Sequence, residues 1–282
     1  MLNIIGMGLG NEKDITFNAF EAIKKCKYIY LENYTSSLMF DVKDLEKLIG
    51  KKVILANREL IEISDEIIGN SKKSDVALLV KGDVFSATTH VDLFLRAGHE
   101  NIKCKVFHNA PILTAIGDTG LSLYKFGKVV SIPFDYSNVY SSYDTFVQNC
   151  DAHTLFLLDL KPAENKYMDF KDGLNYILEK SQERKDSKIT KDTKAVVCAA
   201  LGTEKSVIKY GKISDLLKLE IKAYPQCIIL PGKMHFVEEE LLDLFKTAWF
   251  LILSLILILM ADDGYNEYLE FYSRNNGKGD LF

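Results

Sequence analysis

The chain begins with short apolar runs that alternate with amphipathic stretches, which is the pattern of a parallel α/β sheet. In the first part of the chain this pattern predicts strands over residues 2–5, 28–32, 53–55, 76–80 and 103–108. It predicts helices over residues 15–26, 41–49, 60–70 and 91–97. On the first of these helices, the side chains expected to face the core are those of Phe17, Phe20, Ala22 and Ile23.

The second part of the chain has a less regular pattern. Strands are expected over residues 129–133, 154–160, 195–200 and 226–230, and helices over residues 111–117 and 167–185. Residues 137–142 are polar and are expected to form a loop. The break at residues 98–101 is predicted as the boundary between an N-terminal α/β domain, residues 1–98, and a C-terminal α/β domain, residues 102–240.

A tail follows over residues 241–282, and its residues 248–261 form an almost unbroken apolar run. A membrane-spanning helix needs about 17 to 25 apolar residues, so this run is short for one, and no basic flank fixes an orientation. Three interpretations stay open: a buried helix or strand, a weak membrane anchor, or a tail foreign to the rest of the fold. At the other end, the first residues lead directly into a strand, so no signal peptide is expected.

The composition, with 48% hydrophobic and 26% charged residues, is typical of soluble globular proteins. The formal net charge of −4 and the scattered lysines argue against a general nucleic-acid binder. The five cysteines are widely spaced and form no Cys-x-x-Cys pair, which indicates neither a disulfide framework nor a metal site. They fit a reducing compartment such as the cytoplasm, where most are expected to be small buried side chains.

Small and polar residues follow one predicted strand after another, in segments 6–10, 82–90, 108–112, 157–161, 199–203 and 231–236. In segment 82–90, Gly82 permits a sharp turn and Asp83 can accept hydrogen bonds. The residues able to cap the following helix are Ser86, Thr88 and Thr89. Open α/β sheets bind ligands at the carboxyl ends of their strands, so this recurrence predicts a binding cleft.

The glycine run Gly6-Met7-Gly8-Leu9-Gly10 also resembles a nucleotide-binding turn, with Glu32 at the end of the next strand, where a ribose-binding carboxylate would lie. However, residues 11–14 separate the glycines from the helix and include two acids, whereas a pyrophosphate requires positive potential there. A dinucleotide site is therefore disfavoured.

Taken in order, these segments resemble the tetrapyrrole-methylase-like (class III) family of S-adenosylmethionine-dependent methyltransferases, and within it the diphthine branch. The resemblance runs from residue 1 to about residue 240. The motifs that carry it lie at residues 5–10, 14–16, 30–36, 87–90, 108–110, 115–117, 123–127, 131–134 and 157–159. Segments 32–36 and 123–134 are similar to the diphthine branch in particular.

The resemblance implies a homodimer of two α/β domains, with S-adenosylmethionine folded in the cleft between them and S-adenosylhomocysteine as the product. The implied acceptor is a histidine of elongation factor 2 that carries an aminocarboxypropyl group. Its amine is methylated, and the eukaryotic branch also methylates its carboxylate. Such an enzyme would act in the cytoplasm, without nucleic acid or membrane. Carried over position by position, the implied cofactor contacts are Leu9, Asp83, Ser86, Pro111, Ile112, Leu160, Leu201 and His235.

The chain departs from the family pattern at several of these positions. Val84 and Ser86 replace the proline and second glycine of a usual Gly-Asp-Pro-Phe-Gly, Pro111 replaces a serine, and Ala200 stands where arginine is common. These departures put cofactor affinity and turnover in doubt more than the fold.

Two alternative functions stay open: a small-molecule methylase of a tetrapyrrole, and a relative that no longer binds the cofactor and serves as a binding module. Methyl transfer to an amine requires the amine to be deprotonated, so a nearby base could assist. The titratable candidates are Asp83, Asp159 and His235, and none of them is assigned the catalytic role.

Overall fold

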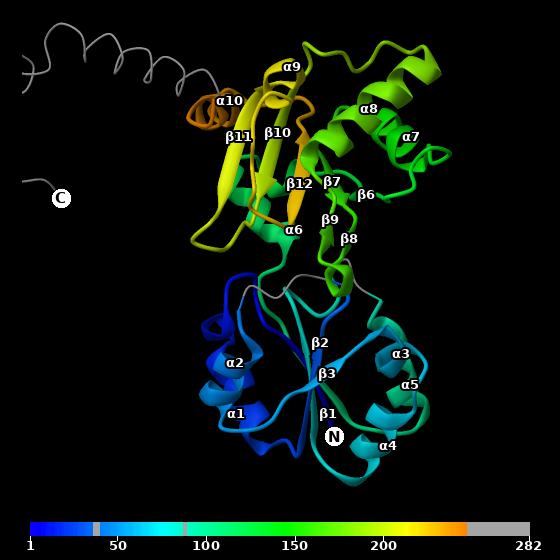
Figure 1. Cartoon of the computed structure of the whole chain (residues 1–282), viewed down its shortest axis with the longest axis vertical. Helices are drawn as coiled ribbons and strands as arrows, with labels where there is room; N and C mark the ends of the chain where they lie inside the picture. Colours follow the sequence, from blue (N-terminus) through cyan, green and yellow to red (C-terminus); the bar gives the residue numbers. More distant parts are fainter. Residues whose placement is uncertain (36–39, 87–88, 247–282) are drawn as a thin grey trace, which may run out of the picture.

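The computed structural model describes residues 1–35, 40–86 and 89–246, which form two α/β domains, one below the other in Figure 1. The apolar run over residues 248–261 lies outside the described residues, so the structure tests none of the three interpretations of it. None of the helices in the described ranges has the length and apolar character that a membrane crossing requires.

The first domain is built on a five-stranded parallel sheet with the order β3-β2-β4-β1-β5. Every strand predicted for this part of the chain is present, which confirms the parallel α/β pattern. The strands are β1 (Leu2–Gly6), β2 (Tyr28–Glu32), β3 (Ile54–Ala56), β4 (Val76–Val80) and β5 (Cys104–Phe107).

Helices cover both faces of this sheet (Figure 1). On one face lie α1 (Phe17–Lys25) and α2 (Val42–Ile49), and on the other α3 (Arg58–Glu62), α4 (Glu66–Lys73) and α5 (Val91–His99). Successive strand residues enter opposite cores: Ile4 packs with the second group of helices and Ile5 with the first. Burial on both faces explains why these strands are nearly continuous apolar runs.

Two details of the helices differ from the prediction. Phe17 is exposed, whereas Ala19 and Ile23 are buried, because two positions correspond to about 200° of helical rotation and place Phe17 on the far side from Ala19. The helix predicted over residues 60–70 is two helices. The chain breaks between them, where the Ser64 hydroxyl accepts a hydrogen bond from the Glu66 N–H at 3.1 Å.

The first sheet extends further along the chain than the predicted domain boundary. Strand β5 pairs with β1, opposite residues including Leu2 with Cys104 and Ile5 with Phe107. The break at residues 98–101 is therefore a turn inside the first domain, where Asn101 takes a left-handed conformation (φ 55°) between α5 and β5. The exact limits of the two domains stay a prediction. The last strand of the first sheet ends at Phe107, and the strands that follow belong to other sheets.

The second domain contains a mixed sheet with the order β11-β10-β12-β7-β6. Its members are β6 (Val130–Ile132), β7 (Thr154–Leu158), β10 (Lys194–Ala199), β11 (Val207–Lys212) and β12 (Gln226–Leu230). Only β6 and β7 are parallel to each other. Strand β11 was not predicted from the sequence, and neither was helix α7 (Ser141–Gln148), which begins inside the segment expected to be a loop.

Helices α7, α8 (Phe170–Arg184) and α9 (Ile213–Leu216) pack on one face of this sheet. On the other face lie α6 (Ile112–Ala115) and α10 (Phe236–Asp243). The helix expected over residues 167–185 starts only at Phe170, because Asp169 caps it by accepting a hydrogen bond from the Lys171 N–H at 2.9 Å. Before it, a short hairpin of β8 (Leu160–Lys161) and β9 (Lys166–Tyr167) reaches toward the first domain (Figure 1).

Helix α10 is fixed to the sheet by one buried carboxylate, that of Glu238. It accepts hydrogen bonds from the N–H groups of Ser122 (2.9 Å) and His235 (2.7 Å) and forms an ion pair with Lys125. The His153 Nδ1 accepts a hydrogen bond from Gly232, so its Nε2 carries the proton and donates to Glu238 at 3.2 Å. Burial alone would raise the pKa of Glu238, but Lys125 and the N–H donors hold it well below its usual range.

We expect Glu238→Gln to lower the free energy of unfolding at pH 7 by about 2 to 4 kcal/mol, because the neutral amide that replaces the buried carboxylate cannot form an ion pair with the half-buried Lys125 ammonium. The folded-state pKa is lowered, so this stabilisation is complete above the unfolded carboxyl pKa of about 4.3 and is lost as the pH falls below it. Denaturant unfolding at pH 7 and pH 3 should show the difference from wild type shrinking at the lower pH.

Glu240→Gln is the matched control, since Glu240 is exposed on the same helix. Its effect should stay within about 0.5 kcal/mol at both pH values. Equal losses in the two variants would contradict a special role for Glu238.

Candidate functional site

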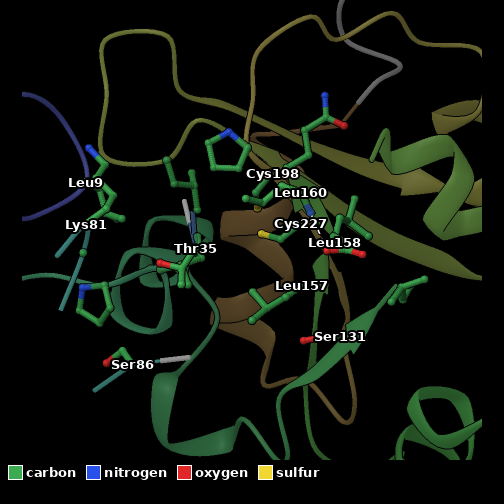
Figure 2. Close-up of a pocket in the computed structure, with 18 of the residues that line it drawn as sticks. Leu9, Thr35, Lys81, Ser86, Ser131, Leu157, Leu158, Leu160, Cys198 and Cys227 are labelled. Atoms are coloured by element: carbon green, nitrogen blue, oxygen red, sulfur yellow. Dashed lines mark hydrogen bonds between the residues drawn. The ribbon is translucent and has the colours of Figure 1, made fainter. Parts of the chain in front are cut away.

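A cavity of about 620 Å³ lies between the two domains. The first domain contributes the carboxyl ends of its parallel strands, and the second contributes the ends of β6, β7 and β10 and the start of β12. Figure 2 shows Leu9, Lys81 and Ser86 on one side of the cavity. On the other side it shows Leu157, Leu160, Cys198 and Cys227. This volume is in the usual range for a small-molecule site, about 300 to 1,000 Å³.

Two glycine turns form the first-domain wall of the cavity. Gly8 follows β1 and Gly82 follows β4, and both have positive φ angles, 77° and 74°. Each donates its N–H to the carbonyl of the other, at 3.0 and 2.9 Å. A Cβ on Gly6 would lie 2.7 Å from the Gly82 oxygen, so the close approach also requires glycine there.

Asp83 holds these turns against the end of β5. One carboxylate oxygen is 2.8 Å from Nδ1 of His108 and accepts the N–H of Asn109 at 3.0 Å. The other accepts the N–H of Phe85 at 3.2 Å and lies 3.4 Å from the Ser86 hydroxyl. Burial alone would raise the pKa of Asp83, but these hydrogen-bond donors lower it. Asp83 is therefore ionised and connects these segments, and its acceptor positions are occupied.

The loop after β1 is fixed by Asn109 and Asp14. The Asn109 amide donates to the carbonyls of Gly6 (3.1 Å) and Asp14 (2.9 Å), and the Asp14 carboxylate accepts the Gly10 N–H at 2.6 Å. Helix α1 starts after this loop, so the glycines do not lie at its N-terminus. Glu32 is fully buried and accepts hydrogen bonds from the loop after β2, which leaves it outside the cavity. The geometry thus differs from that of a dinucleotide-binding turn.

Asp159 plays a similar part in the second domain. Its carboxylate accepts the N–H of Phe134 at 3.0 Å and the N–H of Leu160 at 2.8 Å. Phe134 follows β6 and Leu160 follows β7, so this side chain joins the ends of the two parallel strands beside the cavity.

Seven of the eight predicted contact residues line this cavity: Leu9, Asp83, Ser86, Pro111, Ile112, Leu160 and Leu201. His235 does not. It lines a shallower hollow with Tyr124 and Lys125, and its side chain takes part in the capping box of α10. Its contact with a cofactor stays a prediction.

The capping roles predicted for segment 82–90 are not those observed. The Thr89 hydroxyl donates to Glu62 at 2.7 Å instead of capping α5, and Ser86 lies against Asp83. Thr88 lies outside the described residues. His90 occupies the N-cap position without a side-chain cap bond, and burial lowers its pKa to about 4, so the ring is neutral at pH 7.

Sequence reasoning did not find two cationic residues of the cavity wall. Lys81 directly follows β4, is almost fully buried and donates to the Gly10 carbonyl at 2.8 Å. Burial lowers the pKa of Lys81 to about 8. Arg58 is the first residue of α3 and is largely exposed. A lysine directly after the apolar run of β4 was the available signal for Lys81, whereas nothing in the local sequence marks Arg58.

Cys198 and Cys227 lie opposite each other on β10 and β12, and both line the cavity as free thiols. The hydrogen bond between them and their burial raise the pKa of the Cys198 thiol well above its usual value. Cys26, Cys198 and Cys227 are buried, Cys104 is half-buried and Cys150 is exposed. The prediction that most cysteines are small buried side chains is thus confirmed for three of the five.

Comparison with known proteins gives matches along most of the chain. Residues 1–217 match the family model of the Tetrapyrrole (Corrin/Porphyrin) Methylases. A probable diphthine methyl ester synthase of Arabidopsis thaliana is 39% identical over 87% of this chain and 98% of its own length. A diphthine synthase of Methanococcus aeolicus is 38% identical over 86% and 96%. The crystal structure of a putative diphthine synthase from Entamoeba histolytica superposes with a TM-score of 0.81 and 40% identity, covering 87% of this chain and 98% of that one.

We expect Gly82→Ala to lower the free energy of unfolding by about 1 to 2 kcal/mol, because alanine is strained at positive φ. Gly69→Ala is the control, since a Cβ at Gly69 in α4 would meet no atom within 4 Å. There alanine should be neutral or stabilise the protein by up to about 1 kcal/mol. Thermal unfolding of both variants tests this, and a stable Gly82→Ala would argue against the paired glycine turns.

Proposed function

We propose, since the chain belongs to the tetrapyrrole (corrin/porphyrin) methylase family, that it transfers methyl groups from S-adenosylmethionine to the modified histidine of elongation factor 2. It is a methyltransferase of diphthamide biosynthesis, as its relatives are. The observation that carries the proposal is the interdomain cavity, which gathers seven of the eight contact residues expected from the family.

The cavity fits the proposed cofactor in size and chemistry. Apolar side chains such as Leu9, Ile112 and Leu201 can contact an adenosine, while the turns after β1 and β4 present backbone polar groups. A Cβ on Gly82 would point at Pro111 and Leu9, at 3.6 and 3.8 Å, so glycine keeps this part of the cavity open. The proposed cofactor contacts are the seven predicted residues that line the cavity.

When bound, S-adenosylmethionine supplies a methyl group on a positively charged sulfur, which is a good leaving group. The protein must then hold the acceptor amine in line with that methyl group and exclude water. Asp83 and Asp159 already accept backbone hydrogen bonds, and His235 lies outside the cavity. We therefore assign no side chain as catalytic base, and propose that the amine gives its proton to water before it enters.

The departures from the family pattern leave the cavity open. Val84 is fully buried in the core beside β4, and Ser86 lies against Asp83. Pro111 occupies the N-cap position of α6, where an absent N–H has little cost. These placements support cofactor binding over the alternative of a binding module without cofactor, which the titration described below tests. The tetrapyrrole alternative rests on the shared fold alone, whereas the relatives described above are named for diphthine.

We also propose that the enzyme is a cytoplasmic homodimer. In support, an exposed apolar surface is formed by side chains of α10, of Leu244 directly after it and of the neighbouring segment 122–125, which the Ser122–Glu238 hydrogen bond joins to α10. Its most exposed members are Tyr124, Phe236 and Leu244. Exposed apolar patches of this kind mark association surfaces. Light scattering should then give twice the chain mass of 31.9 kDa.

The first test is calorimetric titration with S-adenosylhomocysteine, with NAD as the comparison. We expect saturable binding of S-adenosylhomocysteine alone, followed by methyl transfer to elongation factor 2 purified from cells that lack this methyltransferase. Absence of both would refute the proposed function, and binding without transfer would refute the acceptor.

A variant test locates the cofactor in the cavity. Leu160→Trp should weaken S-adenosylhomocysteine binding about tenfold or more, because extra bulk in a packed site costs about 1 to 3 kcal/mol. Lys161→Trp is the control, since neighbouring strand residues point to opposite faces and Lys161 does not line the cavity. Its affinity should stay within about twofold of wild type. Equal affinities for the two variants would place the cofactor elsewhere.

A further inference from the structure

The cavity wall contains two cationic side chains among its described residues, Arg58 and Lys81, and they differ in access to solvent. Lys81 is 7% exposed, and its ammonium is bound to the Gly10 carbonyl. The Arg58 side chain is 67% exposed. An acceptor that belongs to another protein must enter from solvent, and of these two cations Arg58 is the one that is open to solvent.

Arg58 is held in place by contacts that do not use its hydrogen-bonding edge. The guanidinium carbon lies 5.1 Å from the centre of the Tyr34 ring, a cation–π contact. Its Nε is 4.0 Å from the Glu62 carboxylate, which is beyond hydrogen-bond distance. That same Glu62 oxygen already accepts the hydroxyls of Tyr34 (3.1 Å) and Thr89 (2.7 Å). Within residues 1–35, 40–86 and 89–246, the Arg58 guanidinium thus has no hydrogen-bond acceptor, and its donors are available to a ligand in the cavity.

The proposed acceptor group, an aminocarboxypropyl chain, carries a carboxylate as well as the amine that is methylated. Planar guanidinium groups bind carboxylates through two parallel hydrogen bonds, and this fixes the orientation of the bound group. Asp83 and Asp159, the acids of the cavity wall, have their oxygens bound to backbone N–H groups and offer no cation for such a carboxylate.

We infer that Arg58, supported by Tyr34 and Glu62, binds the carboxylate of the acceptor side chain and so presents its amine to the cavity. This inference rests on the proposed function. Methylation of the amine leaves the carboxylate charged, so the same contact can hold the acceptor through the successive transfers to the amine, though not through a methylation of the carboxylate itself. The positioning role of Tyr34 also gives a physical reason for that residue in segment 30–36.

The test compares Arg58→Met, Arg58→Lys and Lys52→Met, the last as a control at a 91% exposed side chain that does not line the cavity. The assay follows methyl transfer to elongation factor 2 from cells that lack this enzyme. Arg58→Met should lower kcat/KM about 10- to 100-fold, mainly through KM, which is the range for a lost hydrogen bond to a charged group. Arg58→Lys should recover part of the loss, and Lys52→Met should match wild type.

The Kd of S-adenosylhomocysteine, measured by calorimetry, distinguishes acceptor binding from a structural role, because damage to the structure of the cavity would also weaken this binding. The Kd for Arg58→Met should stay within about twofold of wild type, with the same thermal midpoint. An unchanged KM, or a loss of S-adenosylhomocysteine affinity parallel to the loss of activity, would overturn the role of Arg58. A wild-type enzyme that methylates no elongation factor 2 would instead refute the proposed function itself.

Discussion

The backbone pair between Gly8 and Gly82 is the constraint on which the rest of the site depends. It joins the loops that leave two adjacent central strands, and it exists only because both residues adopt positive φ angles. Once Gly82 is fixed, Asp83 lies against the end of β5, where its carboxylate binds Asn109. Asn109 in turn holds the loop after β1. Three loops are thus tied together by one backbone pair and by two side chains, those of Asp83 and Asn109, which bind main-chain groups.

Much of the fold could be predicted because the first sheet is buried on both faces. Such strands are continuous apolar runs, and glycine or polar residues mark their ends. Strand β11 lacks this signal: it pairs only with β10 within its sheet, and its middle residues include Lys209 and Gly211. Helix α7 begins at two serines, and the Ser142 hydroxyl donates to the Ser131 carbonyl, a tertiary contact that local periodicity cannot show.

The candidate site was predictable to the extent that its residues follow strands. Leu9, Asp83 and Leu160 do so, and the convergence of strand ends places them together. The proposed role of Arg58 depends on Tyr34 and Glu62, whose proximity comes from the packing of α3 and the end of β2 into one core. No spacing along the chain encodes that contact. For His235, in contrast, the local sequence is sufficient, because His235 and Glu238 three residues later form the capping box of α10.

The two domains contribute different chemistry to the cavity. Among the described lining residues, the two cationic side chains, Arg58 and Lys81, come from the first domain, whereas the second contributes mainly apolar groups such as Leu157, Leu158 and Leu160. Because apolar walls exclude water, they strengthen the interactions of the charges across the cavity. The cationic and the apolar parts of the cavity wall therefore come from different domains, and the cavity brings them together because it lies between those domains.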